Sequence, residues 1–306
     1  MRTAHIGGLE VSVIGLGCNN FGRALDAEAS AKVVAAALDA GIDFFDTASN
    51  YGEGQSESFL GAALGRRRED VVIATKFGVP VPGWEGSGGA ASAYVRQSAE
   101  RSLRELGTDY IDLLMIHFPD PKTPIEITMA AMSELVEAGK VREIGCSNFD
   151  PNQLEAASRA AESLGLTLVC DQVHLSMVHR DPLHDGTVEV AHRLGVSVLP
   201  YYPLASGLLT GKARRGHVPE GRLQMDRYQH FLTEENFDLV DALDAFAVQR
   251  GRSVVQIALG WLIAHEDVPA VTAGATRPQQ VRANAAAGDW VPTEEDLTEL
   301  ARLVGV

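Results

Sequence analysis

The stretch Gly41-Ile-Asp-Phe-Phe-Asp46-Thr-Ala-Ser-Asn-Tyr51-Gly-Glu-Gly-Gln-Ser-Glu57 joins a strand, a turn and the start of a helix. Residues 42–46 are mostly apolar up to a final carboxylate, which predicts a buried strand that ends abruptly at Asp46. A turn rich in Ser, Asn and Gly follows and carries the phenol of Tyr51, and helical spacing begins at Ser56. Buried polar groups cost free energy unless specific partners pair with them. An acid and a phenol at this position therefore indicate a functional site.

The rest of the chain repeats this strand–helix order. Residues 2–17 predict a hairpin around Gly7-Gly8, with a second strand that continues to Gly17. Further buried strands are predicted at 71–76, 111–117, 141–146, 168–172, 197–201 and 270–272. Helices are predicted at about 27–40, 56–64, 92–106, 125–138, 151–164, 187–194, 237–250, 254–265, 278–287 and from 294 onward.

Counted from residues 13–17, the chain contains eight strand–helix units within 306 residues. This number favours a closed (β/α)8 TIM barrel with an N-terminal β-hairpin and extra C-terminal helices. A doubly wound open sheet is the alternative. Because no low-complexity linker interrupts the pattern, residues 1–306 are predicted to form a single domain.

Composition narrows the class of protein. The chain has 26 basic and 41 acidic residues, a formal net charge of −15, which disfavours nucleic acid and anionic membrane surfaces as partners. Its three cysteines form no disulfide framework and no metal-binding pattern, which fits a reduced cytoplasm. The N-terminus lacks a signal-peptide pattern, and no apolar stretch is long enough to span a bilayer. The sequence therefore predicts a cytoplasmic protein, and it leaves the oligomeric state open.

Three polar residues stand at the ends of successive predicted strands: Asp46, Lys76 and His117. In a barrel the C-terminal strand ends form one mouth, where active sites lie, so these residues and Tyr51 should converge there. Taken singly, each residue type more often has a structural role at such a position. A strand-end Asp commonly caps a helix or anchors a loop, a Lys usually points to solvent, and a His is often a structural group with its hydrogen bonds satisfied. Their joint placement on neighbouring strands favours a catalytic role.

Together these four residues could turn a phenol into an acid catalyst. A tyrosine with a pKa near 10 holds its proton tightly at neutral pH. The ammonium of Lys76 should favour the phenolate and lower the pKa of Tyr51, while Asp46 keeps Lys76 charged. A ring N–H of His117 could orient a substrate carbonyl toward Tyr51. Such a site would polarise and protonate a carbonyl group, and a nicotinamide would provide the electrons.

The second half of the chain has candidates for holding a nicotinamide. Ser147 and Asn148 follow one strand and Gln172 ends the next, and their hydroxyl and amide groups suit the donor and acceptor pattern of a carboxamide. Tyr201 places an aromatic face where a planar ring could stack. Near the C-terminus, residues 274–280 open a helix with an Arg and a Thr, which suits a phosphate. A plain helix cap with a solvated Arg277 is the alternative for that segment.

Two other motifs carry less weight. The segment Gly15-Leu-Gly17-Cys-Asn-Asn20 resembles a dinucleotide fingerprint, but Asn20 stands where Gly or Ala is needed. It is better explained as the end of the first barrel strand, with its backbone near the ligand. The side chains of His174, His179, Asp181 and His184 run through a loop with no regular zinc spacing, so no metal site is predicted.

With these motifs, the sequence resembles the aldo-keto reductase family over essentially its whole length. Residues 41–52, with Ser56-Glu57, are similar to the most specific signature of that family. Further blocks match in the expected order: Thr75-Lys76, Ile116-His117, Gly145-Cys-Ser147-Asn148-Phe149, Tyr201-Tyr-Pro-Leu204 and Gly207-Leu-Leu-Thr-Gly-Lys212.

The resemblance implies a (β/α)8 barrel and reversible reduction of aldehydes or ketones to alcohols, with Tyr51 as proton donor. NADP(H) is the implied cofactor, in preference to NAD(H), and the partner is a small-molecule carbonyl or alcohol. The implied catalytic tetrad is Asp46, Tyr51, Lys76 and His117. The implied cofactor contacts are Ser147, Asn148, Gln172 and Tyr201 at the nicotinamide, Leu204, Ser206, Gly207, Leu209 and Lys212 at the pyrophosphate, and Gly274, Thr276, Arg277, Gln280 and Asn284 at the 2′-phosphate.

Some features leave alternatives open. His174-Leu175 and Thr272-Ala273-Gly274 depart from the family pattern, the first on the substrate side. Trp84 and the insertion at 214–230 are expected to line the substrate pocket, but they name no substrate. A cofactor-binding regulatory subunit of the potassium-channel beta type is one alternative function. A barrel aldolase with Lys76 as a Schiff-base lysine is another.

Overall fold

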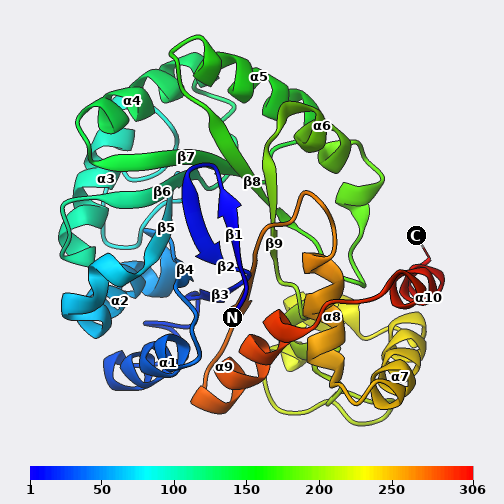
Figure 1. Ribbon diagram of the computed structural model, residues 1–306. Coiled ribbons are helices and arrows are strands. Elements are labelled where there is room, and N and C mark those ends of the chain that lie inside the picture. The colour runs from blue at the N-terminus through cyan, green and yellow to red at the C-terminus, as the bar shows by residue number, and fades with distance from the viewer. Residues whose placement is uncertain (306) are drawn as a thin grey trace.

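The computed structural model describes residues 1–305 and places eight parallel strands in a ring (Figure 1). Hydrogen-bonded neighbours run in the order β10, β3, β4 and onward to β9, and the two outer strands, β9 and β10, are in contact. The predicted barrel is therefore confirmed, and the open-sheet alternative is wrong. The strands are β3 (Ile14–Gly17), β4 (Phe44–Asp46), β5 (Val72–Phe77), β6 (Ile111–Ile116), β7 (Val141–Ser147), β8 (Leu168–His174), β9 (Ser197–Tyr201) and β10 (Val271–Gly274).

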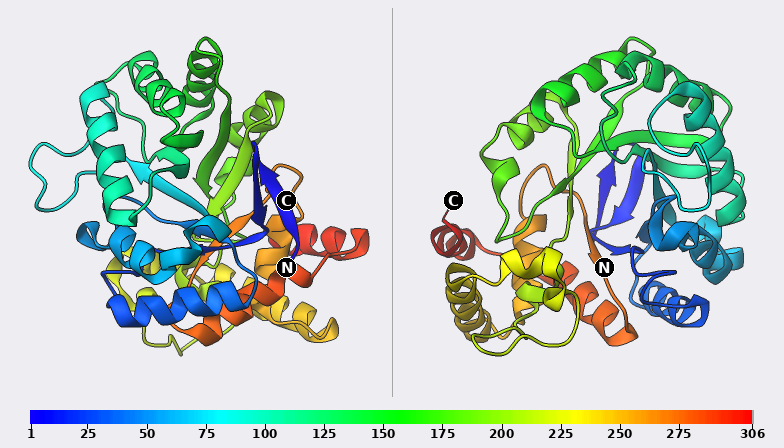
Figure 2. Two further views of the ribbon diagram at one scale, coloured as in Figure 1. Left: turned by 60° about the vertical axis from the view of Figure 1, so that its left-hand side comes forward. Right: turned by 180° about the vertical axis from the view of Figure 1, so that it is seen from behind.

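Helices cover the outside of this ring (Figure 2). Buried strands flanked by helices explain why the strand sequences are almost continuously apolar. The helices are α1 (Ala27–Asp39), α2 (Ser56–Leu64), α3 (Ser92–Leu106), α4 (Ile125–Glu137), α5 (Pro151–Glu162), α6 (Thr187–Leu194), α7 (Glu234–Gln249), α8 (Val254–Ile263), α9 (Pro278–Ala285) and α10 (Glu294–Val304). Most bounds agree with the predictions within one or two residues; α7 begins earlier because Thr233 caps it by accepting from the amide of Asn236.

An antiparallel hairpin, β1 (Thr3–Ile6) and β2 (Leu9–Ser12), closes the N-terminal end of the barrel (Figure 1). Its buried residues Ile6, Leu9 and Val11 share a core cluster with side chains inside the barrel. That end is therefore filled with apolar side chains, and the opposite end, where the strands finish, remains as the mouth.

The predicted continuous strand from the hairpin to Gly17 is wrong, because the chain leaves one sheet at Ser12 and enters the other at Ile14. Ser12 is held at this junction by Asp43: its amide donates to Oδ1 at 2.6 Å, and its Oγ accepts from the Asp43 amide at 3.1 Å. Because this bend depends on Asp43, which is 31 residues away in the sequence, the residues next to Ser12 do not predict it.

Among residues 1–305, none of the helices combines the length and the apolar character that crossing a bilayer requires.

Candidate functional site

Two neighbouring strands end in glycine at one arc of the barrel mouth. The last residues of β10 and β3, Gly274 and Gly17, pair in register, and Gly17 in turn pairs with Asp46 at the end of β4. On the other side of this arc, β9 ends at Tyr201 and lies against β10. These two strand ends therefore carry no side chain of their own between the ring of Tyr201 and the carboxylate of Asp46, on the edge where barrel enzymes bind their ligands. The side chains of Asn19 and Asn20 border this arc, since a Cβ at Gly274 would lie 3.5 Å from Asn20 Nδ2 and 3.6 Å from Asn19 Oδ1.

A buried ion pair joins the next two strands. The ammonium of Lys76 lies 2.5 Å from Asp46 Oδ1 and donates to the carbonyl of Thr47 at 2.8 Å. The side chains of Lys76 and Asp46 are 0% and 6% exposed. Removing one partner of such a pair leaves an uncompensated buried charge, so each residue fixes the other in place.

Tyr51 and His117 complete the group. The Nζ atom of Lys76 lies 5.1 Å from the centre of the Tyr51 ring, and the Tyr51 and His117 rings meet edge to face at 5.7 Å. Tyr51 begins a short turn (Tyr51–Gly54) after β4, and His117 directly follows β6. The structure therefore brings together the four residues that the sequence placed at one mouth. Their catalytic roles stay predictions.

Burial decides the charge states in this group. Burial and the negative charge of Asp46 raise the pKa of Tyr51 well above its usual range. The net shift of the Tyr51 pKa is thus opposite to the lowering expected from Lys76, because burial of the phenol is its largest cause. Burial, with the charge of Lys76 as a second cause, lowers the pKa of His117 to about 3. Its imidazole is therefore neutral, and within the described residues its buried Nδ1 has no hydrogen-bond partner.

The predicted carboxamide ligands are hydrogen-bonded to the tetrad. Tyr201 donates its hydroxyl to Asn148 Oδ1 at 2.7 Å, and Asn148 Nδ2 donates to the carbonyl of His117 at 3.0 Å. Gln172 donates through Nε2 to Asp46 Oδ1 at 3.2 Å. A carboxamide at this position would share or replace these bonds, so cofactor and tetrad would be directly coupled.

Ser147 is hydrogen-bonded to both of the other predicted carboxamide ligands, Asn148 and Gln172. It is buried, donates through Oγ to the carbonyl of Gln172 at 2.7 Å, and accepts from Asn148 Nδ2 at 2.9 Å. The predicted carboxamide ligands thus form one continuous hydrogen-bond network across the ends of β7, β8 and β9.

Backbone strain is concentrated in the mouth loops. Among residues 1–305, five non-glycine residues have positive φ, and all of them lie in loops that follow β4, β7 or β9. Such conformations cost about 1–3 kcal/mol each and cluster at ligand sites. The five are Glu53, Asn148, Tyr202, Ala205 and Ser206.

The predicted pyrophosphate segment forms a tight turn, Ala205–Thr210, after β9. Ser206 Oγ is buried there and lacks a hydrogen-bond partner among the described residues. A buried hydroxyl without a partner is unfavourable unless a ligand supplies one, so this atom fits a phosphate oxygen. Leu204 and Gly207 are partly buried, Leu209 is fully buried and Lys212 is exposed.

The predicted 2′-phosphate segment lies at the start of α9. Arg277 is exposed, and no carboxylate of the described residues lies within 4.0 Å of its guanidinium. The amide and hydroxyl of Thr276 both donate to Gln280 Oε1, at 2.7 and 3.0 Å. Gln280 therefore supports the turn that presents Arg277. Gly274 is exposed, and Asn284 is buried in the helix.

One residue of the mouth was missed by the sequence reasoning. Arg222, in the long insertion, donates to Asn20 Oδ1 at 2.6 Å and to Asn19 Oδ1 at 3.0 Å, which ties the insertion to the loop after β3. Its charge is close enough to act on the pKa of Tyr51. These contacts span about 200 residues of sequence, so no local spacing marks them.

Trp84 lies in the loop between β5 and α3. Its ring packs on Tyr94 of α3 at 5.3 Å, and the guanidinium of Arg101 lies over it at 5.1 Å. Its expected place in a substrate pocket stays a prediction.

Two of the histidines for which no metal site was predicted, His174 and His179, are in contact through their rings. His174 and His179 stack face to face at 3.8 Å, so the ring nitrogens of the two do not converge on one point. Within residues 1–305 no three His, Cys, Asp or Glu side chains are grouped as ligands of a metal.

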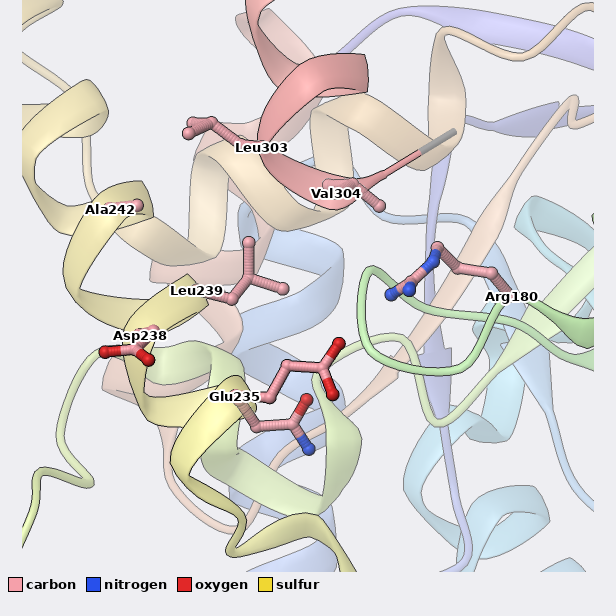
Figure 3. A pocket seen from close by; sticks show the side chains of 8 residues that line it. Arg180, Glu235, Asp238, Leu239, Ala242, Leu303 and Val304 are labelled. Atoms are coloured by element: carbon pink, nitrogen blue, oxygen red, sulfur yellow. The ribbon is translucent and has the colours of Figure 1, made fainter.

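A separate cavity of about 290 Å³ lies between α7, α10 and the loop that carries Arg180 (Figure 3). Its lining mixes Arg180, Glu235 and Asp238 with aliphatic side chains such as Leu239 and Leu303. None of the strand-end residues lines this cavity, so it is distinct from the mouth.

Comparison with known proteins agrees with this geometry. The sequence profile of the Aldo/keto reductase family matches residues 13–304. The chain is 34% identical to aldo-keto reductase YhdN of Bacillus subtilis, over 96% of this chain and 90% of that protein. It is 32% identical to L-glyceraldehyde 3-phosphate reductase of Escherichia coli, over 90% and 84%. It is also 32% identical to a probable voltage-gated potassium channel subunit beta of Arabidopsis thaliana, over 93% and 90%.

Proposed function

Because the chain belongs to the aldo/keto reductase family, and so to the oxidoreductases that act on carbonyl groups, we propose that it is an NADP(H)-dependent carbonyl reductase with Tyr51 as proton donor. The observation that carries this proposal is the convergence of Tyr51, Lys76 and His117 beside two strands that end in glycine. The substrate is a small aldehyde or ketone, or the corresponding alcohol in the reverse direction.

The residues of the mouth fit a dinucleotide. The glycine pair gives access, Tyr201 offers a ring face, and the buried Ser206 hydroxyl lacks a partner in the described structure. Arg222 and Arg277 bring positive charge to a protein whose net charge is −15. When bound, the nicotinamide supplies or accepts the hydride. Arg277 beside the amide-rich start of α9 supports a 2′-phosphate and hence NADP(H) over NAD(H).

His117 and Tyr51 of the tetrad act on the carbonyl oxygen of the substrate, by a hydrogen bond and by proton transfer. A neutral His117 donates one hydrogen bond to that oxygen, which leaves its buried Nδ1 as an acceptor and avoids an unpaired N–H. Tyr51 gives its proton to the oxygen as negative charge develops there. A phenol is ordinarily a stronger acid than an alcohol, so an oxygen that develops negative charge can take the proton of Tyr51. Lys76 then faces the resulting phenolate, and Asp46 keeps Lys76 in position.

The test is turnover of a panel of aldehydes, ketones and sugars, including a phosphorylated aldehyde, with NADPH and NADH assayed separately. In Tyr51→Phe we expect kcat to fall by about 10²- to 10⁴-fold, the usual contribution of a general acid, while NADPH binding is retained. Tyr94→Phe is the matched control, because within the described structure the Tyr94 hydroxyl is buried without a partner. Wild-type turnover in Tyr51→Phe would remove Tyr51 as the proton donor.

A second candidate is a cofactor-binding regulatory subunit of a potassium channel, because two plant relatives carry that name at 32% and 31% identity. The tetrad does not separate the two candidates, since a regulatory subunit can retain it. The same panel does: tight NADPH binding without turnover of any carbonyl would favour the subunit.

The aldolase alternative has less support. A Schiff-base lysine must present a free amine to its substrate. Lys76 is fully buried, and its ammonium is occupied by Asp46 and Thr47. Borohydride trapping of a substrate on Lys76 would reverse this judgement.

We place the protein in the cytoplasm on the basis of its cysteines. All three, Cys18, Cys146 and Cys170, are buried free thiols, which suits a reducing compartment.

A further inference from the structure

Three rings form a stack at the ends of β8 and β9. His174 pairs in register with Tyr201, and their rings lie 5.3 Å apart at an interplanar angle of 14°. The His174 ring also stacks on His179, at 3.8 Å and 14°. Two rings parallel to a third cannot share one face of it, so His174 lies between His179 and Tyr201.

Other aromatic rings hold the edges of the His174 imidazole. Tyr202 and Phe231 meet it edge-on, at 5.6 Å and 6.1 Å. Burial, with His179 and His230 as further causes, lowers the pKa of His174 to about 4, so the central ring is neutral at physiological pH. Its Nε2 is buried and has no hydrogen-bond partner among the described residues. The contacts of this side chain are therefore made through its ring faces and edges.

Tyr201 is constrained at two places by this arrangement. Its hydroxyl donates to Asn148, and one face of its ring is covered by His174. The neighbouring strand on the other side, β10, ends in Gly274, which has no side chain to cover the second face. Tyr202 also meets the Tyr201 ring, at 5.3 Å and a steep angle of 76°, so the orientation of Tyr201 is fixed by two aromatic neighbours as well as by Asn148.

We propose that His174 is a positioning residue: its ring, supported by His179, fixes the plane of Tyr201 so that the face turned away from His174 is ready to stack on the nicotinamide. This inference rests on the proposed function and extends it to a residue outside the tetrad. Aromatic pairs contribute beyond their buried area, and a fixed ring loses less freedom when the ligand binds. The contribution should therefore be confined to the nicotinamide end of the cofactor.

The experiment compares two ligands that differ only in that end. Dissociation constants are measured for NADPH and for 2′-phospho-ADP-ribose, which is the same dinucleotide without its nicotinamide ring. In His174→Ala we expect the constant for NADPH to rise roughly three- to tenfold, and that for 2′-phospho-ADP-ribose to stay at the wild-type value. In His174→Phe, which keeps a flat ring, NADPH affinity should be restored. His184→Ala is the control, an exposed histidine of the same loop that lies outside the stack.

A general loss of structure would weaken both ligands equally in His174→Ala, and that result would overturn the inference. So would unchanged NADPH affinity in His174→Ala, or failure of His174→Phe to restore it. If Tyr201 transmits the effect, adding His174→Ala to Tyr201→Ala should cause no further loss of NADPH affinity; an additive loss would contradict the mechanism. Failure of the wild-type protein to bind either ligand would instead refute the proposed function, and the inference with it.

Discussion

At the scale of single residues, two arginines bring positive charge to the candidate cofactor side of the mouth. Arg222 is held by two neutral amide oxygens, and Arg277 has no carboxylate within 4.0 Å in the described part of the chain. Other arginines are held by acids, for example Arg215 by Glu234 and Asp241, and Arg250 by Asp296 and Glu299. A cation left without an acid in an acidic protein is available to an anionic ligand.

The prediction at this scale concerns Arg277. Arg277→Ala should raise the KM for NADPH about 10- to 100-fold, because a hydrogen bond to a charged group contributes about 1.5–3 kcal/mol. The KM for NADH should stay near the wild-type value, because NADH lacks the 2′-phosphate. Steady-state kinetics with both cofactors measure this, with Arg282→Ala, an exposed change on the same helix, as control. Equal effects on the two cofactors would remove Arg277 from the phosphate site.

The residue types at the strand ends could be predicted because a parallel barrel collects those ends at one mouth. The pKa shifts of these residues could not be predicted from the sequence. The sign of the Tyr51 shift depends on burial and on the closeness of Asp46, which only the folded chain sets. Arg222 was missed for the same reason, since its partners Asn19 and Asn20 come from the other end of the chain.

At the scale of elements, α2 anchors the Tyr51 turn to the barrel. Its first residues are buried: Ser56 donates to the carbonyl of Cys18 at 3.0 Å, and Glu57 accepts from Thr75 at 2.6 Å. At its middle, Gly61 lets α2 approach the end of α3. A Cβ at Gly61 would lie 2.3 Å from the carbonyl oxygen of Leu106, which is backbone and cannot turn away.

Helix propensity and packing make opposite predictions for Gly61→Ala. Propensity alone would stabilise an exposed helix by about 1 kcal/mol. We expect instead a loss of about 1–3 kcal/mol, because the added methyl group overpacks against Leu106. Urea unfolding measures the difference, and Ala62→Gly at the neighbouring exposed position gives the size of the propensity effect in this helix. A more stable Gly61→Ala protein would show that α2 and α3 separate at little cost.

The predicted elements were mostly right because apolar periodicity and end signals are local. Asp26 caps α1 and Asp150 caps α5, and each cap stands directly before its helix in the sequence. The junction between β2 and β3 was wrong because it depends on Asp43, which lies far along the chain.

At the scale of the whole molecule, stability and ligand binding are placed at opposite ends of the barrel. The hairpin fills the N-terminal end with Ile6, Leu9 and Val11, and the candidate site occupies the C-terminal end. We propose that the chain unfolds as one domain, because the hairpin and the strands share a core cluster.

Ile6→Ala tests this separation. Truncating this fully buried side chain should lower the free energy of unfolding by about 2–5 kcal/mol. The kcat and the KM for NADPH should change little at temperatures where the variant is folded, since the mouth is distant from the hairpin. Urea unfolding and steady-state kinetics on the same preparation check both points, with the exposed His5→Ala as control. A selective loss of activity in Ile6→Ala, with unfolding unchanged, would contradict the separation.

The strained backbone at the mouth has a consequence for directed evolution. Glycine at Ala205 or Ser206 relieves positive φ, so a library screened only for heat resistance would be enriched in such changes. Glycine at 205 would loosen the turn that presents the Ser206 hydroxyl, and glycine at 206 would remove that hydroxyl, so catalysis would decline as resistance to heat improved. Thermostable variants of this protein are better sought at the hairpin end, with turnover kept as a parallel selection.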